Sequence, residues 1–146
     1  MKNCKYLFFL LMSVFFGQFA LSEQNADNLC QLTVHFETPK DDAGKIYFLV
    51  FDNPENMGNK NKAYKSGIAD STTVVLSLPY GEYAITAFQD TKHEGKITTN
   101  LFGIPTEPVG ASDNPKLIGI PNWGNTSFLV NQPKQEITIS LKMVMP

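Results

Sequence analysis

Apolar and polar residues alternate with a period of two through much of the chain from Leu29 onward. In the segment "LCQLTVHFE" one face is apolar and consists of Cys30, Leu32, Val34 and Phe36. Successive side chains of a strand point to opposite faces of its sheet, so this pattern is typical of a half-buried strand. The alternation therefore predicts a fold built from strands that share one core.

Further segments have the composition of strands, with turn residues between them, and these are 45–52, 71–78, 82–90, 126–131 and 135–143. The segment 45–52 is apolar on both faces, which predicts a central strand. No segment has a helical period. Short strands with turn signals predict an all-β fold, a single antiparallel β-sandwich of immunoglobulin-like or prealbumin-like type.

Two polar stretches are expected to be loops. Residues 53–67 have no period and are predicted to form a long surface loop. Residues 91–126 are rich in glycine and proline and also contain Phe102 and Trp123, which favours an ordered loop. Excursions of this length in small domains usually have a function, so 91–126 is the segment in which to seek a site.

The chain begins with the pattern of a secretory signal peptide, residues 1–22. Two lysines precede an apolar run of about a dozen residues, which is shorter than the roughly 20 that cross a bilayer. We expect cleavage after Ser22, a short flexible N-terminus at 23–28 and one domain over 29–146. The protein is then exported, to the periplasm or outside the cell, with no membrane insertion after cleavage.

The cysteine count excludes an internal disulfide, and the charge pattern excludes a nucleic-acid binder. Cys30 is the one cysteine beyond the signal peptide, so the sandwich has no internal disulfide, and the period places this thiol in the core. All basic residues are lysine, and they are scattered, with 10 of them against 14 acids after residue 22, a net charge of −4. A nucleic-acid binder presents a concentrated basic face, usually with arginine, so that class is excluded.

The stretch "LPYGEYAITAFQDTKHEGKITTNLFGIPTEPVGASDN", residues 78–114, resembles a bacterial secreted family known as domain of unknown function 2141. The residues that carry the resemblance are Leu78, Pro79, Gly81, Tyr83, Asp90, Gly95, Asn100, Gly103, Pro105, Glu107, Gly110, Ser112 and Asn114. The resemblance implies an exported β-sandwich similar to carboxypeptidase regulatory-like and transthyretin-like modules. It implies no reaction and no ligand.

Within that stretch, "DTKHEGKITTN" resembles a calcium loop. Family members often read "DxNxNGxxDxN", with oxygen ligands at positions one, three, five and nine and glycine at six. This chain keeps Asp90, Gly95 and Asn100, whereas Glu94 and Thr98 are weaker replacements at their positions. The loop is therefore a degenerate calcium-like loop.

Lys92 decides against a metal at the third position. An ammonium offers no lone pair, and a +1 and a +2 charge about 5 Å apart repel by roughly 6–7 kcal/mol at an effective dielectric near 20. We therefore predict no metal and no cofactor, with calcium disfavoured by Lys92. An ammonium in this place is able to replace the metal, for example by pairing with Asp90 to close the turn.

The candidate ligand-binding residues lie in or next to the long loop and are Asp90, Asn100, Glu107, Ser112, Asn114 and Trp123. Trp123 either covers one end of the sandwich or presents a stacking surface. His35 and His93 have no cysteine spaced to complete a zinc set, and both are expected at the surface. The set predicts a recognition surface for an unknown protein, peptide or glycan at one end of a rigid scaffold.

Three functions remain open at this point. The preferred one is a non-catalytic exported binding or interaction module that uses residues 91–126. The alternative is a structural envelope protein, whose edge strands add to the sheet of a partner. The least favoured is a small hydrolase, either with loop carboxylates or with a triad of Ser112, His93 and Asp90. No nucleophile elbow supports that triad.

Overall fold

The computed structural model describes residues 28–39, 44–116 and 120–144. The signal peptide predicted over residues 1–22 lies outside the described residues, as does the predicted flexible N-terminus except Asn28. No helix among the described residues is long and apolar enough to cross a membrane.

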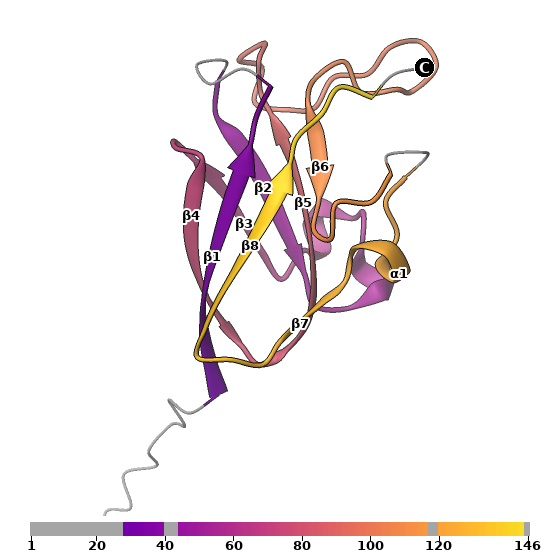
Figure 1. Ribbon diagram of the computed structural model, residues 1–146. Coiled ribbons are helices and arrows are strands. Elements are labelled where there is room, and N and C mark those ends of the chain that lie inside the picture. Colours follow the sequence, from indigo (N-terminus) through magenta and orange to yellow (C-terminus); the bar gives the residue numbers. More distant parts are fainter. Residues whose placement is uncertain (1–27, 40–43, 117–119, 145–146) are drawn as a thin grey trace, which may run out of the picture.

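Two sheets pack face to face, as Figure 1 shows, so the predicted all-β sandwich is confirmed. The three-stranded sheet has the order β4-β1-β8, with β1 at Leu29–Glu37, β4 at Thr73–Pro79 and β8 at Lys134–Ser140. The larger sheet has the order β3-β2-β5-β6, and β7 also pairs with β5. Its strands are β2 (Ile46–Phe51), β3 (Lys65–Ala69), β5 (Gly81–Gln89), β6 (Val109–Ala111) and β7 (Phe128–Val130).

The core lies between the sheets and consists of the inward faces that alternation predicted. On β1 it takes Cys30, Leu32, Val34 and Phe36. Opposite them lie apolar side chains of β2, β5 and β7, and these include Phe48, Val50, Tyr83, Ile85 and Val130. The register is therefore well determined, because a shift of one residue would turn these side chains toward solvent.

β2 lies between β3 and β5, as predicted for a central strand, and its outward face is half-buried at Tyr47 and Leu49 and fully buried at Phe51. The outward side chains of Phe51 and Ala84 face each other in the β2–β5 ladder and are fully buried. The short helix α1 (Trp123–Thr126) packs against β5 at this end. Beside it lie two 3₁₀ turns, Pro54–Asn56 and Lys60–Lys62, and Figure 1 shows them next to α1.

The structure corrects three expectations about elements. The predicted loop 53–67 contains the two 3₁₀ turns and the start of β3, which pairs with β2. The predicted loop 91–126 is divided by β6, and α1 lies in its second part. The sandwich is antiparallel except at one place, since the first and last strands, β1 and β8, pair in parallel. These features depend on contacts between distant segments, which a local pattern does not show.

Cys30 is a free, buried thiol, as predicted. Burial raises the pKa of the Cys30 thiol above its ordinary value, and a smaller effect of the Gln135 backbone lowers it. Because the folded state holds the thiol proton more tightly, this group favours folding below its unfolded pKa. That contribution is lost as the pH rises through the folded pKa.

We predict that native Cys30 resists alkylation, since the thiolate is the reactive form and both access and ionisation are suppressed. In a Cys4→Ser background, labelling by iodoacetamide at pH 8 is expected to be at least about 100-fold slower in the native protein than in urea. The rate is followed by mass spectrometry. Equal rates in the two states would contradict the packed position of the thiol.

Candidate functional site

The excursion between β5 and β6, residues 90–108, lies at one end of the sandwich (Figure 1). It begins at Asp90, whose backbone N–H donates to the Lys45 carbonyl over 2.9 Å and so continues the β2–β5 ladder. Gly44 makes this close approach possible, because a Cβ at that position would lie 2.0 Å from the Asp90 carbonyl oxygen. The start of the excursion is thus fastened to the loop between β1 and β2.

The Asp90 carboxylate builds the first turn. Its side chain is 3% exposed, and its two oxygens accept from the backbone N–H groups of Glu94 at 3.1 Å and Gly95 at 2.8 Å. His93 and Gly95 have left-handed φ values of 58° and 69°, which the tight turn requires. Both Asp90 oxygens are therefore used by the backbone of the loop.

Glu107 closes the excursion at its other end and is fully buried. Its Oε1 accepts from the Lys92 backbone N–H at 3.2 Å. Its Oε2 accepts from the N–H and the hydroxyl of Thr98 at 3.1 and 3.2 Å. One carboxylate thereby joins the first turn to the outgoing and returning arms of the excursion, which are otherwise far apart along the chain.

The ammonium of Lys92 lies against two hydroxyl groups. Nζ donates to Thr98 Oγ1 at 2.9 Å and to Thr106 Oγ1 at 2.7 Å, and those two oxygens are 2.8 Å apart. Since Thr98 Oγ1 also donates to Glu107, the ammonium is connected to the buried carboxylate through one hydroxyl. Hydrogen bonds linked in such a chain polarise one another, so each bond is stronger than it would be alone.

This arrangement corrects one detail of the sequence interpretation. Lys92 does replace a ligand position of a calcium loop, but its hydrogen-bond partners are Thr98 and Thr106 rather than Asp90. The carboxylate of Asp90 accepts from main-chain N–H groups. Of the oxygens at the calcium-like positions of the loop, those of the Asp90, Thr98 and Asn100 side chains accept hydrogen bonds from the protein.

The middle of the excursion is a small hairpin with an apolar tip. Thr99 and Pro105 form an antiparallel bridge, and the Asn100 N–H donates to the Ile104 carbonyl at 2.9 Å. The Asn100 side-chain oxygen accepts from the N–H groups of Phe102 and Ile104 at 2.9 and 3.0 Å. Asn100 therefore shapes the tip.

At that tip two large apolar side chains point into solvent. The exposed fractions of Leu101 and Phe102 are 101% and 88%. Gly103 has a φ of 76° and its N–H donates to the Asn100 carbonyl at 3.0 Å, so the turn is closed. We call residues 100–104 the hairpin tip.

Ser112 and Asn114 lie on the side of the sandwich. The buried Ser112 hydroxyl accepts from the Ile85 N–H at 2.9 Å and donates to the Thr126 carbonyl at 2.6 Å. The Asn114 side chain accepts from the Ser140 N–H at 2.7 Å and donates to the Thr138 carbonyl at 2.8 Å, so it occupies the open edge of β8. Both residues hold strands and the segment after β6 together.

Trp123 is the first residue of α1 and is half-buried. Figure 1 shows α1 beside the larger sheet, away from the excursion that carries Asp90 and Glu107. Trp123, as part of α1, therefore lies in a helix that packs against β5 and not in the excursion. The structure places Asp90 and Glu107 at the two ends of the excursion and Asn100 at its tip, while Ser112, Asn114 and Trp123 lie outside it.

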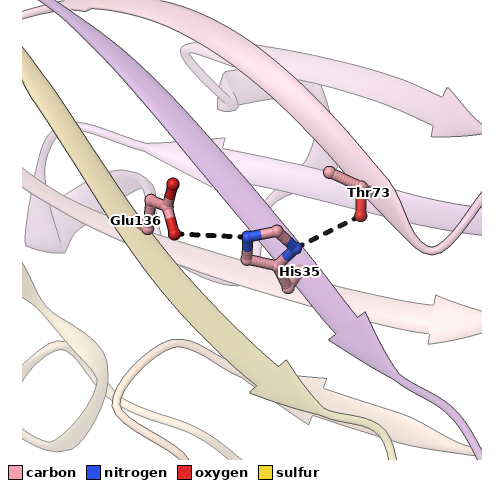
Figure 2. A network of polar contacts seen from close by, with 3 residues as sticks. All are labelled: His35, Thr73 and Glu136. Atoms are coloured by element: carbon pink, nitrogen blue, oxygen red, sulfur yellow. Dashed lines mark hydrogen bonds and ion pairs between the residues drawn. The ribbon is translucent and has the colours of Figure 1, made fainter.

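The two histidines are at the surface, as predicted. His35 lies on β1 between the neighbouring strands, with Nδ1 3.2 Å from the Thr73 hydroxyl and Nε2 3.6 Å from a Glu136 carboxylate oxygen (Figure 2). His93 is exposed in the first turn of the excursion. In the described part of the chain, no group of three or more histidine, cysteine, aspartate or glutamate side chains is placed to hold a metal ion.

The family model described as "uncharacterized protein conserved in bacteria (DUF2141)" matches residues 34–138, which span both sheets and the whole excursion. The chain belongs to this family. The resemblance to DUF2141 is thereby confirmed, while the similarity to carboxypeptidase regulatory-like and transthyretin-like modules stays a prediction. No curated protein and no solved structure matches the chain. The description of DUF2141 names no activity, so function has to be argued from the geometry.

Sequence reasoning missed Leu101, Phe102 and Thr106 as members of this site. A signal for the tip was present, because Asn100 and Gly103 are turn residues and enclose two adjacent large apolar residues. No comparable signal marked Thr106, whose hydroxyl meets Lys92 only through the return of the chain.

We predict that Glu107→Gln lowers the free energy of unfolding by about 1.5–3 kcal/mol. The side-chain NH2 of glutamine would face N–H and O–H groups of the loop, which are donors themselves and cannot accept its hydrogen bonds. Glu107→Ala, which leaves those donors without any acceptor, is expected to cost about 3–5 kcal/mol. Urea denaturation measures both.

The matched control is Glu82→Gln, at an exposed position on β5, with an expected change within about 0.5 kcal/mol. If Glu107→Gln were as stable as that control, the carboxylate would not be the contact that holds the excursion.

Proposed function

We propose that this chain is an exported, non-catalytic binding module whose contact element is the hairpin tip. The observation that carries the proposal is the exposure of Leu101 and Phe102 on a backbone fixed by hydrogen bonds. Soluble proteins expose single apolar residues routinely, but two adjacent, almost fully exposed large side chains on an ordered turn are typical of an interaction site.

The energetics support a partner with an apolar recess. Burying a leucine or phenylalanine side chain contributes about 1.5–3 kcal/mol, so the tip offers roughly 3–6 kcal/mol to a partner that encloses both side chains. Because Asn100 already orders the turn, binding carries no additional entropic cost for ordering it. A recess in a protein suits this chemistry better than a glycan, whose surface is mostly polar.

The state of the polar groups supports a module without catalysis. The carboxylates of Asp90 and Glu107 accept from backbone N–H groups, and Glu107 is fully buried. The Ser112 hydroxyl donates to the Thr126 carbonyl, so it is engaged in structure rather than poised as a nucleophile. The alternative triad of Ser112, His93 and Asp90 therefore has little support.

Export is the second part of the proposal and is supported by the signal peptide pattern of residues 1–22. A partner is then to be sought in the periplasm or outside the cell. No cofactor enters the proposal.

We predict that replacing the tip abolishes partner binding and leaves stability unchanged. In Leu101→Ser/Phe102→Ser, the melting temperature is expected to stay within about 2 °C of wild type, because the side chains contact little in the free protein. The test uses a photo-crosslinking amino acid at position 102 of the full chain, irradiated in an extract of its own bacterium, with the exposed position 129 on β7 as the matched control.

A discrete adduct is expected from position 102 only. Excess purified wild-type protein should compete it away, and the double serine variant should not. Competition by both proteins alike, the same adduct from position 129, or no adduct from position 102 would contradict the tip as the contact element.

A further inference from the structure

The edges of the two sheets are closed to different degrees. On β8 the Asn114 side chain occupies the backbone groups of Thr138 and Ser140. β6 is joined to the end of the other sheet, since Val109 and Lys142 exchange both backbone hydrogen bonds at 2.9 and 2.8 Å. β4 pairs with β1 on one side only, and Figure 1 shows it at the outer left margin of the sandwich.

Two hydrogen bonds at the ends of the β1–β4 ladder determine which residues of β4 face outward. Phe36 N–H donates to the Thr72 carbonyl at 2.7 Å, and Tyr80 N–H donates to the Asn28 carbonyl at 2.8 Å. In an antiparallel ladder, residues that hydrogen-bond to the partner strand alternate with residues whose N–H and C=O groups point away from it. The even-numbered residues of β4 therefore bond to β1, and the odd-numbered residues direct N–H and C=O to the open edge.

Both ends of that open edge are already satisfied. The Ser71 hydroxyl donates to the Thr73 carbonyl at 2.9 Å and accepts from its N–H at 3.4 Å. At the other end Pro79 has no N–H, and its carbonyl accepts from the Tyr83 hydroxyl at 3.0 Å. On this edge of β4, the backbone N–H and C=O groups of Val75 and Ser77 remain without a partner among the described residues and face solvent.

The N–H and C=O groups of Val75 and Ser77 are spaced so that a second copy of the same strand can pair with them antiparallel. When a second β4 lies beside the first with a two-fold axis at Leu76, Val75 of each copy faces Ser77 of the other. Each such pair exchanges two N–H to C=O bonds, so all four groups on each copy find partners. The match is isologous, which is the commonest form of contact between identical chains.

The side chains of β4 also permit this contact. Near a two-fold axis a charged residue meets its own copy, and the segment "TVVLSLP" has no charged residue. Charged side chains, and lysine above all, are the usual protection of an edge strand. β3, an open edge of the larger sheet, has that protection, because Lys65 begins the strand and the ion pair of Lys45 with Asp70, at 3.2 Å, follows its end.

We propose that the open edge of β4 pairs antiparallel with β4 of a second copy of this chain, so that the two three-stranded sheets become one six-stranded sheet. The occupant is a second copy because the free groups and the absent charge both satisfy a two-fold axis. A single strand edge buries less than the roughly 1,200 Å² of stable interfaces, so the dimer is weak, with a Kd on the order of 0.1 mM.

Sedimentation equilibrium on the purified protein, from about 0.01 to 1 mM, tests the proposal against two lysine variants. The wild-type mass is expected to rise from monomer toward dimer across this range, and Val75→Lys is expected to stay monomeric with an unchanged melting temperature. The matched control is Ile68→Lys on β3, where the native side chain is 51% exposed against 55% for Val75. This variant is expected to associate as wild type does.

Amide hydrogen exchange gives a second readout that does not depend on a substitution. The amides of Val75 and Ser77 are expected to slow at least about threefold between the lowest and highest concentrations, while those of Ser66 and Ile68 on β3 do not. A wild-type monomer at 1 mM, a Val75→Lys variant that still dimerises, or loss of the dimer in Ile68→Lys alone would overturn the proposal.

Discussion

The carboxylate of Glu107 is the group on which the end of the sandwich depends. Taking a carboxylate out of water costs several kcal/mol unless hydrogen bonds replace its hydration. Here three donors from two residues do so, one from Lys92 in the first turn and two from Thr98 in the outgoing arm, while Glu107 itself lies in the returning arm. The requirement that this buried charge be satisfied therefore constrains the path of the chain between β5 and β6.

The other polar contacts extend that constraint in two directions. Toward the sheet, Asp90 holds the first turn and continues the β5 ladder to Lys45. Toward solvent, the Lys92 ammonium joins the hydroxyls of Thr98 and Thr106 directly below the bridge that begins the hairpin tip. The exposed side chains of Leu101 and Phe102 thus stand on a hydrogen-bonded polar base.

Much of the fold was predictable because the two-residue period of β1, β4 and β8 is a local property. Residue pairs such as Leu32 and Leu76 lie opposite each other in the register that the shared face requires. β3 was missed because Lys65–Ala69 is an edge strand with small and polar residues and no visible period. β6 has three residues and exists through its pairing with β5 and the bridge to Lys142, so no local signal marks it.

The site was predictable as a set of residues but not as an arrangement. Asp90, Asn100 and Glu107 could be selected by their place in a family pattern, and in the structure their side-chain oxygens accept hydrogen bonds from the backbone of the excursion. Ser112 and Asn114 belong to the same pattern and fasten strands. The exposure of Phe102 could not be predicted from the sequence, because an apolar residue in a loop is buried in some folds and exposed in others.

A thermal melt with millimolar calcium and with chelator tests the central claim that hydrogen bonds and a lysine, without a metal, hold the excursion. The account predicts the same midpoint in both conditions, within about 1 °C. A metal bound at 100 times its dissociation constant would add roughly 2.7 kcal/mol. In a domain of this size such a gain raises the midpoint by about 8–15 °C, and a shift of that kind would contradict the account.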